Sequence, residues 1–224
     1  MRAEQTGFRM SASLWVVTAA LLGALSSTLF SSVLHFPRDV FVGLHSVAVV
    51  GFMVALVRLE GFDPRVQLRR RWLGGLVVGA MAGALLARTV LSQPASPRPS
   101  GVSLVWALLW NGGVYGIIDA LLLSVFPVLL VYGGRPADQL RNPAARWGWG
   151  LSALLASLLI TAAYHAGFTE FRGPMLASAL IGNGIMTLSY LASGSPVAPI
   201  LSHVVMHVAA VLHGMATTVQ LPPH

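Results

Sequence analysis

The chain has 224 residues, of which 55% are hydrophobic and only 9% are charged. An ordinary soluble domain carries about 25% charged residues, so the composition excludes that class and predicts an integral membrane protein with a single domain over residues 1–224. The net charge of +7 comes entirely from arginines that flank apolar runs, which argues for contact with membrane lipid and against nucleic acid. The chain contains no cysteine, which excludes disulfides, iron–sulfur clusters and thiol catalysis.

Seven apolar runs predict an all-α, polytopic membrane protein of about seven transmembrane helices, because a spanning helix needs about 20 residues. The first run could instead be a signal peptide, but its apolar core exceeds the usual length of about 7–15 residues. We therefore expect a retained first helix. In chain order the predicted spans are Ser13–Leu34, Val40–Val57, Trp72–Leu91, Val102–Val131, Trp147–Phe168, Pro174–Leu191 and Val197 to about Thr217.

Two of these spans carry internal features. Gly75, Gly79 and Gly83 recur every four residues in the third span, a pattern that lets another helix approach closely. The fourth run is too long for an untilted span. We expect residues 111–113, Asn-Gly-Gly, to break or bend it and Pro127 to kink it.

The arginines predict how the chain is oriented. With the N-terminus inside, ten arginines fall in inner segments and three in outer ones. This asymmetry predicts a cytoplasmic N-terminus and, with seven spans, an external C-terminus; we place the chain in a bacterial inner (plasma) membrane. The inner set is Arg2, Arg9, Arg58, Arg65, Arg69, Arg70, Arg71, Arg135, Arg141 and Arg146, and the outer set is Arg38, Arg98 and Arg172.

Four polar residues within the apolar runs are candidates for a functional site. Asp119 is the one acidic residue inside an apolar span, and it is joined by His165, His203 and His207. An aspartate at the centre of a membrane helix costs about 2.5–3.5 kcal/mol on insertion scales, so such residues are functional candidates by default. His203 and His207 are four residues apart, which places both imidazoles on one helix face. The structural alternative is a protonated Asp119 and histidines that hydrogen-bond neighbouring helices.

The other histidines are less promising by position. His213 follows near the end of its helix and is interpreted as a bystander. His35, His45 and His224 lie at or towards span ends or the terminus, where we expect interfacial positions.

Two of the histidine segments, ITAAYHAGF and GSPVAPILSHVVMHVA, resemble the CPBP family of intramembrane proteases, which includes CAAX proteases and bacteriocin-processing enzymes. The family shows a paired glutamate followed by an arginine, then Phe-x-x-x-His, then His-x-x-x-Asn. His165 matches the histidine of the second motif, with Thr161 at the phenylalanine position. His203 matches the histidine of the third, and His207 takes the place of the asparagine. The resemblance covers about residues 112–214 and implies a CPBP-like helical core there.

The first motif of the family is degenerate in this chain. Asp119 alone stands where two glutamates are expected, and Leu123 or Ser124 stands at the position of the arginine. The run Glu170-Phe171-Arg172-Gly173 looks like the end of that motif, but it follows His165 instead of preceding it, and we interpret it as a coincidence.

The resemblance implies a divergent intramembrane peptidase that acts on a membrane-associated peptide. Asp119 would be the general base that activates a water, and His165 and His203 would orient that water and hold the oxyanion. Three alternatives stay open. Asp119 and the three histidines form a set that suits a divalent metal such as zinc, or iron; the chain could be a metal- or heme-binding membrane protein; or it could be an inactive scaffold or binding protein. For an active enzyme, we expect metal dependence or loss of activity in His207→Asn.

We expect Asp119, His165, His203 and His207 to share one cavity between the fourth, fifth and seventh spans. The predicted helix bounds put His165 about 27 Å along its span and His203 about 9 Å along its own, at 1.5 Å per residue. A shared cavity therefore requires a short turn before Val197, a tilted helix or a different start for the fifth span.

Overall fold

The computed structural model describes residues 10–69, 71–133, 142–216 and 220–221. This part of the chain is helical and contains no strand, which confirms the all-α prediction. Several residues used in the orientation argument lie outside the described residues, as do His224 and the predicted end of the last span at Thr217. Those arginines are Arg2, Arg9, Arg70, Arg135 and Arg141.

Six helices in the described residues are long and apolar enough to cross a membrane, so the chain is an integral membrane protein. A shorter apolar helix of 17 residues, α10, follows them. The elements run in the order α1 (Ala12–Ser26, continued by a π-helical stretch, Ser27–Val33), α2 (Arg38–Glu60), α3 (Pro64–Arg69), α4 (Trp72–Leu91), α5 (Gly101–Ala107), α6 (Tyr115–Ala120), α7 (Phe126–Gly133), α8 (Pro143–Ala166), a 3-10 turn (Thr169–Phe171), α9 (Pro174–Ser193) and α10 (Val197–His213).

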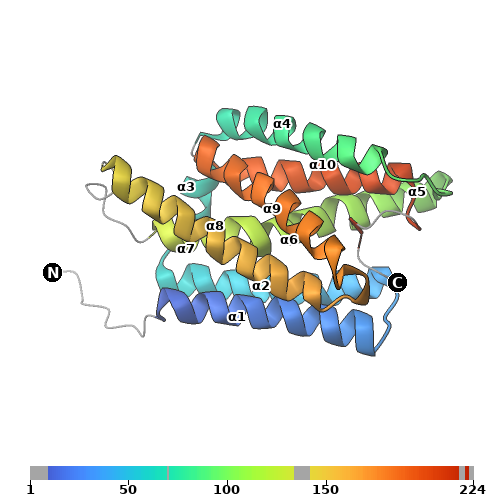
Figure 1. The fold of residues 1–224 in the computed structure, drawn as a ribbon, viewed down its shortest axis with the longest axis horizontal. Helices are drawn as coiled ribbons and strands as arrows, with labels where there is room; N and C mark the ends of the chain where they lie inside the picture. Colours follow the sequence, from blue (N-terminus) through green and yellow to red (C-terminus); the bar gives the residue numbers. More distant parts are fainter. Residues whose placement is uncertain (1–9, 70, 134–141, 217–219, 222–224) are drawn as a thin grey trace.

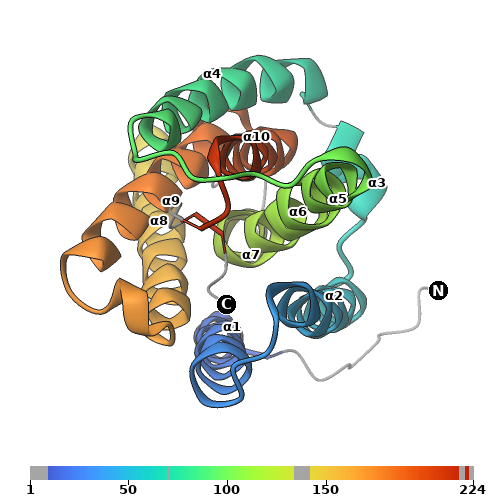
Figure 2. The same cartoon turned by 90° about the vertical axis from the view of Figure 1, so that its right-hand side faces the viewer.

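The helix formed by α5, α6 and α7 lies at the centre of the bundle. It is continuous from Gly101 to Gly133. In its apolar stretch of 18 residues 72% are buried, against 28–33% in the corresponding stretches of the other five spans. Seen end-on, α7 and α10 lie between α4 on one side and α1 on the other (Figure 2). The central helix therefore presents side chains to neighbours on most of its circumference, and Asp119 is part of it.

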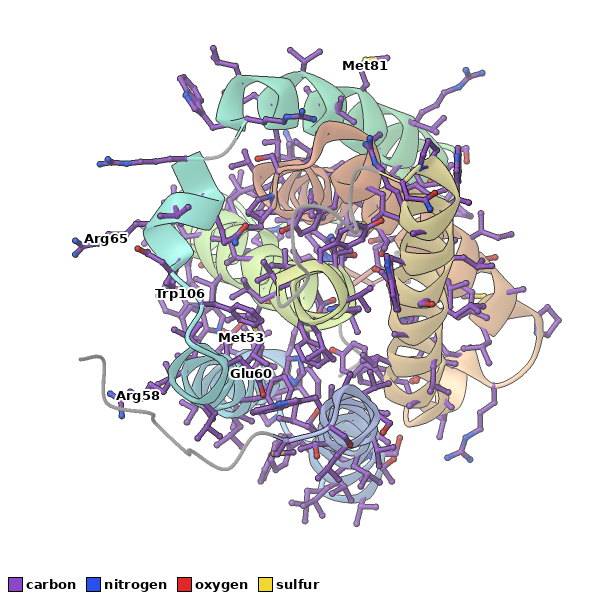
Figure 3. The ribbon with its side chains drawn as sticks, turned by 90° about the vertical axis from the view of Figure 1, so that its left-hand side faces the viewer. Met53, Arg58, Glu60, Arg65, Met81 and Trp106 are labelled. Atoms are coloured by element: carbon purple, nitrogen blue, oxygen red, sulfur yellow. The ribbon has the colours of Figure 1, made fainter. Side chains whose placement is uncertain are left out.

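The outer helices show apolar side chains to their surroundings, as a bilayer requires. Val47 is 74% exposed and Met81 is 69% exposed, and Met81 points away from the bundle (Figure 3). The helices α1, α2, α4 and α10 run roughly along the long axis of the molecule, and α8 and α9 cross it obliquely (Figure 1). One polar contact lies at the helix ends: the Trp15 indole N–H donates to Glu60 Oε1 at 2.8 Å, which ties the start of α1 to the end of α2.

The glycine pattern of the third span has the predicted role. A Cβ added at Gly75, Gly79 or Gly83 would lie 2.6–2.9 Å from atoms of Ser195, Ala198 or Val205. These three contacts run along α10 and the turn before it, so the small residues let α4 and α10 pack almost backbone to backbone.

The predicted break in the fourth run takes a different form. Residues 111–113 lie in a π-helical stretch, Leu108–Val114, and Pro127 follows a second one, Leu121–Val125. The helix stays continuous through both, because a π-turn absorbs the irregularity by widening one turn and keeping the chain on its axis.

Candidate functional site

Pro127 shapes the central helix next to Asp119. A proline has no N–H to donate to the carbonyl four residues before it, here Leu123. The Leu123 carbonyl instead accepts from Ser157 Oγ on α8 at 2.6 Å and from Asn183 Nδ2 on α9 at 3.4 Å. The missing backbone hydrogen bond therefore becomes a link between three helices.

A buried network of small polar side chains extends this link. Asn183 accepts from Ser124 Oγ at 2.8 Å and donates to Ser157 Oγ at 2.9 Å and Thr161 Oγ1 at 2.6 Å. Thr187 joins both serines, at 2.7 Å from Ser157 and 3.1 Å from Ser124. Every member has a partner, as buried polar groups in a membrane protein require. The network fixes α6 and α7 against α8 and α9, and so fixes the position of Asp119.

The Asp119 carboxylate lies between two imidazoles. Its Oδ1 is 3.7 Å from His45 Nε2 and its Oδ2 is 3.6 Å from His207 Nε2. These side chains come from α6, α2 and α10, and at 4%, 0% and 2% exposure the three residues are buried. The distances exceed a hydrogen bond of about 2.7–3.2 Å. Opposite charges about 4 Å apart still attract by roughly 4 kcal/mol at an effective dielectric of about 20.

His45 is fully buried inside the bundle and faces Asp119, which the sequence analysis did not expect of it. The helix α2 begins at Arg38, so His45 lies two turns inside it, on the same face as Phe41 and Phe52. Its ring stacks on Phe41 and on Tyr164, with centroids 5.6 Å and 5.1 Å apart. The sequence signal that could have found it is this aromatic spacing along one helix face.

Two tyrosines that the sequence analysis missed stand beside Asp119. The hydroxyl groups of Tyr115 on α6 and Tyr164 on α8 are 2.8 Å apart, and the Tyr164 ring stacks on His45, which flanks Asp119. The Tyr115 ring also packs on His207, with centroids 4.7 Å apart. Tyr115 lies one helical turn before Asp119, which is the spacing that would have pointed to it.

The tautomers of His165 and His203 follow from their backbone contacts. His165 Nδ1 is 2.9 Å from the Thr161 carbonyl oxygen, and His203 Nδ1 is 2.9 Å from the Pro199 carbonyl oxygen. A carbonyl oxygen only accepts, so each Nδ1 carries a proton. In the neutral ring the remaining nitrogen, Nε2, is therefore an acceptor or a ligand and not a donor.

A cavity of about 600 Å³ contains this site. All four predicted residues, Asp119, His165, His203 and His207, line it, together with Tyr115. The lining extends from Gln93 and Pro94, just beyond α4, to Leu123 in the middle of the central helix. His165 and His203 therefore line one cavity although they lie at different distances from the starts of their helices, Pro143 and Val197.

The four predicted residues are not all in contact. Asp119 faces His207, and the rings of His203 and His207 have centroids 6.3 Å apart. His165 instead packs on Phe171, with centroids 4.7 Å apart, and is half-buried. Within the described ranges, no three His, Cys, Asp or Glu side chains form a group that could hold a metal ion. Metal binding by the four residues therefore stays a prediction.

The fold and the site define a class: an integral, all-helical membrane protein with a carboxylate–imidazole cluster inside the bundle. No protein-family model, no curated protein and no solved structure matches the chain.

Proposed function

We propose that the chain is a divergent CPBP-like intramembrane hydrolase that cleaves a membrane-associated peptide. The observation that carries the proposal is the buried Asp119 carboxylate, which two imidazoles flank at 3.6 Å and 3.7 Å within a cavity of about 600 Å³. Such a group, in reach of several proton donors and acceptors, is suited to general acid–base chemistry. The resemblance over about residues 112–214 supports the same class.

The same proposal includes the topology. We infer that α10 is a seventh span, because 17 residues lie at the lower end of the range of about 17–25 for a spanning helix. With the N-terminus in the cytoplasm of a bacterial cell, the ends of α4 and α8 lie at the outer face. The cavity lining reaches Gln93 at this end, so water from that side can enter.

The reaction we propose is a direct attack of water on the peptide carbonyl. The water oxygen bonds to the carbonyl carbon while Asp119 takes a proton from that water. The carbonyl carbon becomes tetrahedral, and its oxygen becomes an oxyanion. The C–N bond then breaks, and the proton held by Asp119 passes to the leaving amine. A neutral His203 accepts at Nε2 and so orients the water.

Holding the oxyanion requires hydrogen-bond donors, and this reassigns one expected role. The neutral tautomers of His165 and His203 offer no proton at Nε2, whereas Tyr115 and Tyr164 carry hydroxyl groups at the site. Two hydroxyls that hydrogen-bond each other have at least one further proton to donate. We therefore assign the oxyanion to Tyr115, which lines the cavity, with the Tyr164 hydroxyl donating to the Tyr115 oxygen.

The test is a cleavage assay in liposomes with purified protein and a pool of fluorescently labelled single-span peptides. In water enriched in oxygen-18, a hydrolase places the heavy isotope in the new carboxyl terminus, which mass spectrometry detects. We expect His203→Gln to lower the rate by about 10²-fold, within the usual range for groups that assist proton transfer.

The matched control is His213→Gln on the same helix, because the His213 ring bonds the Gln93 carbonyl at 2.7 Å instead of facing Asp119. Its rate should stay near that of the wild type. Equal rates in both variants, or cleavage without isotope uptake, would refute this mechanism. A folded wild type that cleaves no peptide in the pool would favour the non-catalytic alternative.

A further inference from the structure

The segment that follows α10 is fastened to the end of the bundle by hydrogen bonds. Ser96, in the connector between α4 and α5, donates its N–H to the His213 carbonyl oxygen at 3.3 Å. Its Oγ accepts from the N–H of Ala216 at 3.1 Å. On the other side, Arg38 Nη2 on α2 donates to the Met215 carbonyl oxygen at 3.1 Å. The first residues of the segment are therefore tied to two other parts of the chain.

Further along this segment, Gln220 and Leu221 line the cavity that contains Asp119. Leu221 is only 3% exposed, and Met206 on α10 both lines the cavity and packs against the apolar cluster around Leu221. Figure 2 looks onto this end of the bundle and shows the dark red segment after α10 between α9 and α7. We call the apolar surface around Leu221 the notch, and it is formed by Val90, Ala107, Ala210 and Val211.

The notch lies at the end of the cavity that we assign to the outer face. Val90 is in the last turn of α4, three residues before Gln93, which lines the cavity at that end. Asp119 belongs to the middle of the central helix instead. A peptide that enters from the outer end therefore passes the notch before it reaches Asp119.

The contacts of Gln220 and Leu221 hold this part of the segment only weakly. Burial of the Leu221 side chain is favourable. However, the Gln220 side-chain oxygen, Oε1, is buried and has no hydrogen-bond partner among the residues that the structure describes. A buried acceptor without a partner costs free energy of the same order as burial of one leucine side chain contributes. The second effect offsets much of the first, so a ligand with better contacts can displace Leu221.

We propose that the notch is a subsite for an apolar side chain of the bound peptide, and that Leu221 fills it as a competitor until the peptide displaces it. A notch that encloses a leucine takes apolar side chains of similar volume and leaves a charged one without a partner. The inference deepens the proposed function and rests on it, because the displacing ligand is the peptide of that reaction. Its test reads binding and needs no hydrolysis.

The first measurement is thiol labelling of Met206→Cys in liposomes with a charged methanethiosulfonate reagent. Adding Leu221→Ser should raise the labelling rate by about 3–10-fold, because the serine no longer holds the segment in the notch. The control is Ser178→Cys, which also lines the cavity but is itself exposed on α9, and its rate should not change. Leu221→Ala should act in the same direction and covers the case in which Leu221→Ser does not fold. No change at Met206→Cys, or the same rise at both cysteines, would overturn the proposal.

The second measurement follows Leu221→Cys itself while a peptide is added. A single-span peptide with a leucine near its outer end should displace residue 221 and raise the labelling rate of this cysteine. A matched peptide with aspartate in place of that leucine should not. Equal rates with both peptides would overturn the subsite. If no peptide is cleaved while both labelling results agree with expectation, the proposed function falls and the subsite stands.

Discussion

Asn in place of Asp119 is expected to lower the rate of peptide hydrolysis by about 10²–10⁴-fold, the contribution typical of a general acid–base group. The amide has nearly the same shape as the carboxyl group but takes up no proton from water. The fold should persist, because the amide fills the same volume as the carboxyl group and brings no charge into the buried site. The isotope assay in liposomes measures the rate, and thermal unfolding checks the fold.

Asp63→Asn is the matched control for this variant. Asp63 Oδ1 accepts from the backbone N–H of Arg65 at 2.9 Å before α3, and Asn serves about as well as Asp at such a position. The same loss of one negative charge should therefore leave hydrolysis unchanged. Activity in Asp119→Asn within about threefold of the wild type would show that Asp119 is not the base.

Leu in place of Gly79 is expected to cause a large loss of stability. A Cβ at this position would lie 2.7 Å from the Ala198 carbonyl oxygen and 2.9 Å from Ala198 Cα. Both are backbone atoms of α10, so no side-chain rotation relieves the clash. Overpacking of this kind costs about 1–3 kcal/mol, which corresponds to a fall in Tm of roughly 2–12 °C for a chain of this size.

The control lies on the same helix. Gly74 has no atom within 4 Å of an added Cβ, and Gly74→Leu makes the same gain in helix propensity. Fluorescence-detected size exclusion after heating compares the two. If Gly79→Leu and Gly74→Leu melt together, the close packing of α4 on α10 is not what holds α10, and with it His203 and His207, in place.

Hydropathy alone predicts most of the architecture, because the main requirement for a helix that spans a bilayer is a long apolar sequence. Five predicted spans correspond to α1, α2, α4, α8 and α9, and the fourth to the continuous helix from Gly101 to Gly133. The glycines at 75, 79 and 83 predict a close helix contact without naming the partner, which the structure identifies as α10. The spacing of small residues within one helix predicts which face is in close contact, but it does not identify the neighbouring helix.

The site is predicted less fully for a physical reason. In a membrane helix both the lipid-facing and the bundle-facing side are apolar, so the pattern of residues has little contrast between them. Asp119, His203 and His207 stand out because ionisable groups are rare at membrane depth. His45 has the same property, but its nearness to a predicted span end concealed it. Tyrosine is a frequent residue near the ends of membrane helices, so Tyr115 and Tyr164 do not stand out in the sequence. Only the contact between their hydroxyl groups indicates a role.

The polar network around Asn183 could not be predicted from the sequence either. Its members are spread over α8, α9 and the central helix, and single Ser, Thr or Asn residues in apolar runs are unremarkable. Pro127 was recognised as an irregularity, but its consequence depends on which helix faces the freed Leu123 carbonyl. That is a property of packing between helices and not of one segment.

The central claim, a water-filled cavity that leads to an ionised Asp119, is tested most directly by thiol labelling. The chain has no cysteine, so single-cysteine variants react without background. Met206→Cys lines the cavity, and Leu188→Cys lies on the apolar exterior, where Leu188 is 50% exposed. A charged methanethiosulfonate reagent reacts with the thiolate, which forms only in contact with water. We predict labelling of Met206→Cys and not of Leu188→Cys in liposomes; a Met206→Cys that reacts only after denaturation would contradict the account.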